Sequence, residues 1–172
     1  RECVDAFFVV KSRGRQRLVI DCRRSNCWFE EAEHTPLCSG DTLSSLELEV
    51  GDDLYIGQTD LAYAFYHIEL PVELRKYFGL RPVRACDIGV TSADGRPVSP
   101  DDLVYPLMAV MPMGWNWALS WCQQVLQAGA TRAGLAVHSR LEDGRRAGSL
   151  GTGRHVTYVD IFAALGTDQA EV

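Results

Sequence analysis

The sequence lacks several features that mark well-defined protein classes. No apolar run reaches the ~18 residues that a membrane-spanning helix needs, so we expect no helical membrane span. None of the six cysteines forms a Cys-x-x-Cys pair, the spacing typical of zinc sites and thiol redox centres. We therefore expect free thiols in an intracellular protein, cytoplasmic or nuclear. No signal-peptide pattern leads the chain, which begins with Arg1 rather than Met, so we expect part of a longer protein.

Basic residues are also missing from one long stretch. Residues 28–60 contain nine acidic residues and no Lys or Arg. Residues 1–27 hold seven Lys and Arg against three acidic residues, and residues 103–155 hold five arginines against two. The net charge of −6 argues against an indiscriminate nucleic-acid binder, but this alternation leaves two stretches able to attract anions.

A β-hairpin is predicted near the start of the chain. Ala6–Val10 and Leu18–Cys22 are short runs of β-branched and aromatic residues, and Gly14 lies between them at the expected tip. The connecting segment is unusually cationic, with Lys11, Arg13, Arg15 and Arg17. It can be a solvated basic turn, or a finger that grips phosphate through point charges and forked donors.

The rest of the sequence alternates strand and helix patterns. Residues 42–54 fit either a short helix or an edge strand, and Pro71 is placed to open a helix. Asn116 is placed to cap the main helix. Residues 129–155 are Gly- and Arg-rich with little periodicity and are expected to form a mobile insertion. Strands are predicted at Ile56–Leu61, Phe78–Leu80, Ile88–Val90, Val104–Val110, His155–Val159 and Ile161–Leu165. This order predicts an α+β fold with an antiparallel sheet packed on helices.

Two aspartates lie inside apolar, aromatic-rich strand patterns. Asp60 follows Ile56–Thr59, and Asp160 lies between Val159 and Ile161. A carboxylate in such surroundings is costly to bury unless it is paired, hydrogen-bonded or bound to a cation. Brought together by folding, the two would form a divalent-metal site suited to phosphoryl transfer.

Four blocks of the sequence resemble the reverse transcriptases of retrotransposons and retroviruses. Lys11 with Arg17-Leu-Val-Ile-Asp21-Cys-Arg23-Arg-Ser-Asn26 resembles the fingers segment, and Asp60-Leu-Ala-Tyr-Ala64-Phe65-Tyr-His-Ile68 resembles the first palm motif. Pro112-Met113-Gly114 with Gln123 nine residues later is similar to the Pro-x-Gly…Gln motif, and Tyr158-Val159-Asp160 to the start of the Tyr-x-Asp-Asp box. The blocks occur in the family's order and span nearly the whole chain.

The resemblance implies a partial right-hand polymerase that adds deoxynucleotides to an RNA or DNA primer–template. Residues 1–55 would be mainly fingers, 56–128 palm and fingers, 129–155 the insertion and 156–166 the catalytic hairpin, with the thumb absent. Asp60 and Asp160 would be the catalytic ligands of two Mg²⁺ ions. Lys11 and Arg17 would hold the deoxynucleoside triphosphate, and Phe65 would exclude a 2′-hydroxyl. The nucleotide and template face would be lined by Met113, Gly114 and Gln123.

Ile161 departs from the family pattern, because a second aspartate is expected there. Losing one carboxylate weakens a site that must hold two mutually repelling cations. The resemblance therefore implies a weakened or inactive polymerase. The alternative is a non-catalytic remnant of a retroelement that binds nucleic acid or protein.

Overall fold

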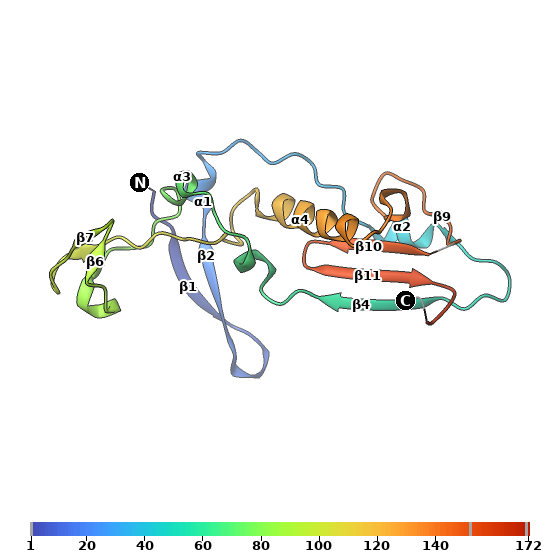
Figure 1. Ribbon diagram of the computed structural model, residues 1–172, viewed down its shortest axis with the longest axis horizontal. Coiled ribbons are helices and arrows are strands. Elements are labelled where there is room, and N and C mark those ends of the chain that lie inside the picture. The colour runs from blue at the N-terminus through green and yellow to red at the C-terminus, as the bar shows by residue number, and fades with distance from the viewer. Residues whose placement is uncertain (1, 152, 171) are drawn as a thin grey trace. The chain divides into compact units, whose positions relative to one another are not determined.

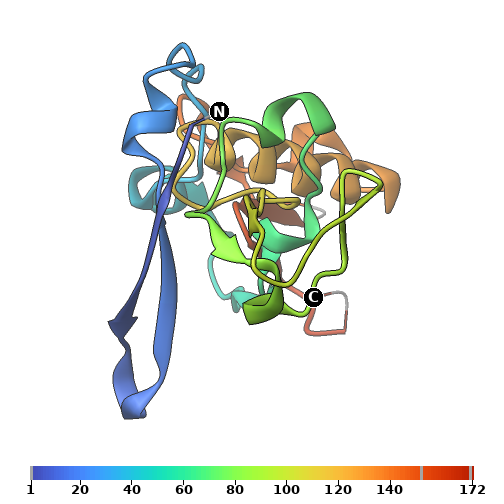
Figure 2. The same ribbon diagram turned by 90° about the vertical axis from the view of Figure 1, so that its left-hand side faces the viewer.

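A β-hairpin forms where the sequence predicts one. The computed structural model describes residues 2–151, 153–170 and 172, and only the backbone of Arg13. β1 (Asp5–Val10) pairs antiparallel with β2 (Gln16–Asp21), and the 3₁₀ turn η1 (Ser12–Gly14) joins them. Gly14 has a φ of 70°, a left-handed conformation that costs glycine little. Figure 2 shows the hairpin as a long two-stranded ribbon.

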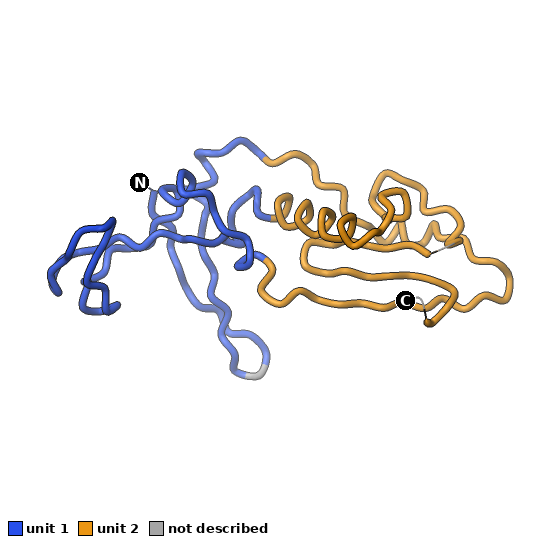
Figure 3. Tube along the Cα trace, in the orientation of Figure 1, with its two compact units in different colours: residues 1–31, 65–118 blue, residues 32–64, 119–172 orange. Residues whose placement is uncertain are grey.

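The chain divides into two compact units, each built from two separate stretches of sequence. The first unit contains residues 1–31 and 65–118, and the second contains residues 32–64 and 119–172 (Figure 3). Besides the hairpin, the first unit holds α1 (Arg23–Asn26), most of η2 (Ala64–His67), α3 (Val72–Arg75), β5 (Val83–Arg84), η3 (Ala85–Ile88), β6 (Ser92–Ala93), β7 (Arg96–Pro97) and β8 (Leu103–Val104). Its short strands form two antiparallel pairs, β5 with β8 and β6 with β7.

Aromatic side chains form the core of the first unit. Phe29 stacks on Phe78 with ring centroids 5.9 Å apart, and both rings meet Trp115 edge to face. Such offset and edge-to-face pairs are the favoured aromatic geometries, and they add to the hydrophobic gain of burial. Phe78 is fully buried. The sequence segments around these three residues are thereby held against one another.

A three-stranded antiparallel sheet organises the second unit, in the order β10–β11–β4 (Figure 1). Its strands are β4 (Tyr55–Asp60), β10 (Arg154–Tyr158) and β11 (Ile161–Gly166). The main helix, α4 (Ala118–Arg132), bonds to β10 through Gln123 and Thr157. The remaining elements are α2 (Gly40–Ser44), β3 (Leu46–Glu47), η4 (Val137–Ser139) and β9 (Gly148–Ser149). The molecule is therefore of mixed α+β class, as the sequence predicts.

Residues of the expected insertion contribute to the core of the second unit. Leu141, Ala147 and Leu150 are buried in one cluster with Val156 and Leu165 of the sheet. The 129–155 segment also completes α4 and supplies η4 and β9, which pairs with β3. Its apolar residues are few and irregularly spaced, which is why the sequence showed no periodic pattern there. The segment is packed rather than structureless.

Four local predictions are wrong, each for an identifiable reason. The strand expected at Phe78–Leu80 is reduced to isolated bridges at Gly79, because the Phe78 N–H donates to the Arg75 carbonyl oxygen in the turn that follows α3. The strand expected at Ile88–Val90 is replaced by η3 and a left-handed Gly89 with φ 66°, which ends regular pairing. Val104–Val110 is reduced to β8 and isolated bridges, since Pro106 has no N–H to give to a ladder. Asn116 does not cap α4, which begins at Ala118: its backbone N–H donates to Asn26 Oδ1.

Two composition-based expectations can be compared with the described residues. All six cysteines are free thiols, three of them buried and three exposed. None of the described helices is long and apolar enough to cross a membrane.

Candidate functional site

The two aspartates singled out in the sequence meet at one end of the sheet in the second unit. β4 and β11 are paired so that Asp60 lies opposite Ile161, and the Leu61 N–H donates to the Asp160 carbonyl oxygen at 2.7 Å. That bond makes Asp60 and Ile161 a non-hydrogen-bonded pair, the closer of the two antiparallel arrangements. Their Cβ atoms are then about 4.5–5.5 Å apart on the same face. Asp160 directly precedes this pair in the β10–β11 turn.

Neither carboxylate is buried, which corrects the reasoning from the apolar strand pattern. Asp60 is exposed and Asp160 is half-buried. Side chains alternate along strands, so Thr157, which bonds to α4, and its partner Phe162 share the face toward that helix. Asp60 and Ile161 lie on the other face. The apolar pattern around Asp60 therefore reflects the strand as a whole and not the surroundings of its carboxylate.

Gln123 of α4 fixes the turn that carries Asp160. Its Nε2 donates to the Thr157 carbonyl oxygen at 2.8 Å and to Thr157 Oγ1 at 3.1 Å, and its Oε1 accepts the Val159 N–H at 2.8 Å. The side chain is 2% exposed. Val159 has a φ of 58°, a left-handed conformation that is strained for a β-branched residue. The buried amide therefore holds a turn that the chain would not readily adopt alone.

A buried thiol lies beside the same turn. Burial, and secondarily the charge of Asp160, raise the pKa of Cys122 to about 11. A thiol with so high a pKa is protonated at neutral pH, and the thiolate is the nucleophilic form. Cys122 is therefore a packing residue and not a candidate nucleophile.

The oxygen donors at the sheet edge suit a cation such as Mg²⁺. The strand register brings Asp60 and Asp160 to the same end of the sheet, and Mg²⁺ is commonly bound by one or two carboxylates together with water and substrate phosphates. Within the part of the chain that the structure describes, no group of three or more His, Cys, Asp or Glu side chains is arranged to hold a metal. Ile161, and not a carboxylate, lies opposite Asp60 in the strand register.

The two cations expected to bind triphosphate lie on the hairpin of the first unit. Arg17 is opposite Val9 in β2, and the Lys11 N–H donates to the Arg15 carbonyl oxygen at 2.7 Å. Continuing this pairing puts Lys11, Arg15 and Arg17 on one face near the tip. All three are exposed, while the side chain of Arg13 is outside the described part. The face is strongly cationic and open to an anion.

At the base of the hairpin, Asp21 and Arg23 form an ion pair. Arg23 donates from Nε and NH2 to both carboxylate oxygens of Asp21, at 2.6 to 3.0 Å. These hydrogen bonds lower the pKa of Asp21 to about 2. The pair is therefore charged at neutral pH and orders the start of α1.

The other expected nucleotide contacts also lie in the first unit. Phe65 is half-buried in η2, and Met113 is 53% exposed. A Cβ on Gly114 would collide with the Ile20 carbonyl oxygen, so only glycine fits at this crossing. Asn26 Nδ2 donates to the Gly114 carbonyl oxygen at 3.1 Å.

Asn26 was named in the sequence only as part of a motif, and no role was predicted for it. It bonds to both Gly114 and Asn116, which ties α1 to the Pro-Met-Gly segment 88 residues later. Thr157 was likewise missed, although its hydroxyl and carbonyl oxygen anchor Gln123. Only its place three residues before Asp160 could have suggested it.

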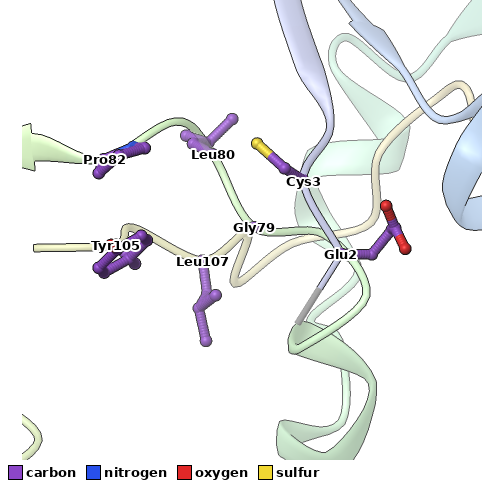
Figure 4. Close-up of a pocket in the computed structure, with 7 residues that line it drawn as sticks. All are labelled: Glu2, Cys3, Gly79, Leu80, Pro82, Tyr105 and Leu107. Carbon is purple, nitrogen blue, oxygen red and sulfur yellow. The ribbon is translucent and has the colours of Figure 1, made fainter.

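A mainly apolar pocket of about 220 Å³ lies in the first unit. Leu80 and Pro82 line it along one segment, and Tyr105 and Leu107 along another, with Cys3 nearby (Figure 4). It contains none of the residues that the sequence singled out for function.

One of three comparisons with known proteins finds a similarity, and that similarity concerns the fold alone. The sequence matches no protein-family model and no curated protein. Among solved structures, it is similar to a foamy viral protease–reverse transcriptase solved in complex with double-stranded DNA, with a TM-score of 0.62 and 13% sequence identity. The match covers 98% of this chain and 22% of that one, so the chain spans about a fifth of that protein's length. The fold of this chain is accordingly similar to part of a protease–reverse transcriptase.

Proposed function

We propose that the chain is the fingers and palm part of a reverse-transcriptase-type polymerase whose nucleotidyl-transfer chemistry is weakened by Ile161. The observation that carries the proposal is the strand register that unites Asp60 with Asp160, residues 100 positions apart in the sequence. The fold similarity to a protease–reverse transcriptase over 98% of the chain supports it. The order of the four sequence blocks adds independent support.

Asp60 and Asp160 would hold Mg²⁺ in this proposal. Mg²⁺ bound there would activate the primer's terminal hydroxyl and offset charge on the leaving pyrophosphate. Lys11 and Arg17 would grip the triphosphate of the deoxynucleotide, as their exposure on one hairpin face allows. Phe65 would contact the sugar, and Met113 and Gly114 would border the nucleotide.

Gln123 receives a different role from the one the motif suggests. Its amide is buried and already makes three hydrogen bonds to the β10–β11 hairpin. It would act as a positioning residue that aims Asp160, and not as a direct contact to nucleotide or template.

Single-nucleotide incorporation onto a labelled primer–template tests the proposal. We expect weak Mg²⁺-dependent incorporation by the chain, a gain from Ile161→Asp, and loss from Asp60→Asn in either background. Gln58→Glu is a matched control. It adds a carboxylate on the same strand and face as Asp60, but two residues before the end of the strand. Incorporation that persists after Asp60→Asn, or that Gln58→Glu raises as much as Ile161→Asp, would contradict the proposal.

The second candidate is a non-catalytic module that binds nucleic acid. It is favoured by Ile161, which removes a carboxylate from the sheet edge but leaves the cationic hairpin intact. RNA binding would then fall with added salt, would need no Mg²⁺, and would weaken on Arg15→Gln with Arg17→Gln. RNA affinity that survives both substitutions would exclude the hairpin as the binding element.

A further inference from the structure

The second unit contains a small polar pocket that the polymerase proposal does not use. It has a volume of about 130 Å³, room for several water molecules at about 30 Å³ each. Four arginines and one glutamate line it together with His138: Arg140, Arg145, Arg146, Arg154 and Glu142. With His counted as neutral, positive charge exceeds negative by three among these residues.

Glu142 organises the cations without neutralising them. Its carboxylate is nearly buried and accepts hydrogen bonds from Arg140 Nε at 3.0 Å and NH2 at 2.8 Å, and it forms an ion pair with Arg145, whose Nε lies 2.8 Å from Oε1. Because a guanidinium has five N–H donors, most donors of both arginines remain for another acceptor. One nearly buried carboxylate thus holds Arg140 by two hydrogen bonds and Arg145 by an ion pair at the pocket.

The other two arginines add charge that is only weakly compensated. Arg154 donates to the Ser149 carbonyl oxygen at 2.8 Å and to the His138 carbonyl oxygen at 3.2 Å, which are neutral partners. Arg146 pairs with Glu47 at 3.2 Å, but both side chains are mostly exposed, so that attraction is well screened.

The pocket is separate from the aspartate pair. Arg154 is the first residue of β10, and the turn with Asp160 follows its last residue. At about 3.3 Å per residue, the strand puts about 20 Å between them. An anion in the pocket would therefore not be the nucleotide that reacts at Asp60 and Asp160.

We propose that this pocket binds a phosphate group. Guanidinium groups match the oxygens of phosphate and can bond them two at a time, and the surplus of positive charge favours an anion. Arg140 and Arg154 are held in place by their hydrogen bonds, and Arg145 and Arg146 are exposed enough to turn toward a bound anion. The phosphate can belong to a nucleic-acid strand or to a free nucleotide, since both present the same oxygens. The site requires no polymerase activity.

The test uses the full chain with Arg145→Gln and Arg146→Gln combined. These two side chains are 61% and 81% exposed, so the substitutions leave the core intact. Arg132→Gln is the matched control: it removes an exposed charge at the end of α4, outside the pocket. Binding of inorganic phosphate is measured by thermal shift against chloride at equal ionic strength, and binding of a labelled single-stranded RNA by anisotropy.

We expect the double variant to lose phosphate affinity by about tenfold or more, the equivalent of one charge-assisted hydrogen bond, and Arg132→Gln to keep it. If RNA affinity falls in parallel and phosphate competes with RNA, the source is a nucleic-acid strand. If RNA affinity is unchanged and AMP binds through the same arginines, the source is a free nucleotide. Equal phosphate affinity in wild type and double variant, or an equal loss in Arg132→Gln, would overturn the proposal. Asp60→Asn should leave phosphate binding unchanged, which separates this site from the polymerase proposal.

Discussion

The substitution Ile161→Asp gives the sharpest test of the strand register at the candidate site. It would create two carboxylates directly opposite each other on one sheet face, with Cβ atoms about 5 Å apart. At that separation, two unit charges repel by about 1 kcal/mol in water and about 3 kcal/mol at an effective dielectric constant of 20. Asp60 is exposed, so the value should lie toward the lower end of this range.

Ile161→Asn is the control that isolates this repulsion. Both variants lose the half-buried isoleucine at a cost of about 1 kcal/mol, but only Asp adds charge. We therefore expect Ile161→Asp to have the lower free energy of unfolding by about 1–2 kcal/mol at low salt. Mg²⁺ at about ten times its dissociation constant should then return about 1.4 kcal/mol to the Asp variant alone.

Urea unfolding followed by circular dichroism measures both effects, in MgCl₂ and in NaCl of equal ionic strength. Combining Asp60→Asn with Ile161→Asp should remove the repulsion and most of the response to Mg²⁺. If the Asp and Asn variants have the same free energy of unfolding and the same response to Mg²⁺, then residue 161 does not face Asp60. The register and the metal site derived from it would both be wrong.

Three further predictions concern groups around this site and the hairpin. Gln123→Leu should lower the free energy of unfolding by about 2–4 kcal/mol, because it leaves the Val159 N–H and the Thr157 hydroxyl without their partner. Gln124 is exposed on the same helix, so the control Gln124→Leu should lower it by less than about 0.5 kcal/mol. Urea unfolding measures both changes. Gly114→Ala should lower the free energy of unfolding by about 1–3 kcal/mol, because its Cβ would collide with the Ile20 carbonyl oxygen, and thermal denaturation should show a lower melting temperature. Gly129→Ala is the control, because a Cβ at this helical position meets open space and should raise the free energy of unfolding by up to about 1 kcal/mol. Burial, and secondarily Arg140, lower the pKa of His155, so the unfolded chain binds a proton more readily than the folded chain. The free energy of unfolding should therefore fall as the pH drops below about 6.5. Denaturation at pH 8 and pH 5.5 measures this fall, which should be smaller in the His155→Gln variant than in the wild type.

Local chemistry made much of the hairpin and sheet predictable. The first hairpin follows from two β-branched runs and one glycine. The β10–β11 hairpin follows from apolar runs on both sides of Asp160. In these places the side-chain pattern and the turn residues favour the same structure, so the sequence is a sufficient guide.

Register and burial were beyond the sequence. The pairing of Asp60 with Ile161 joins residues 101 positions apart and depends on which sheet face α4 covers. The sequence does not show which face of the sheet α4 covers. The apolar residues around Asp60 therefore suggested a buried carboxylate, whereas Asp60 is exposed in the structure. The core role of residues 141–150 was hidden for a related reason, because three isolated apolar side chains carry no periodic signal.

The strained turn at Val159 is held by contacts that do not depend on the residue at position 161. A β-branched residue with φ of 58° costs about 1–3 kcal/mol, and it persists only where its surroundings over-determine it. Here the buried Gln123 amide supplies that constraint by bonding Thr157 and Val159, the residues on either side of Tyr158. None of these contacts involves residue 161, so a substitution at this position should leave the turn that carries Asp160 intact. If the proposed polymerase activity is present, the effect of Ile161 on it should therefore be confined to the charge at this end of the sheet, and Ile161→Asp should restore it.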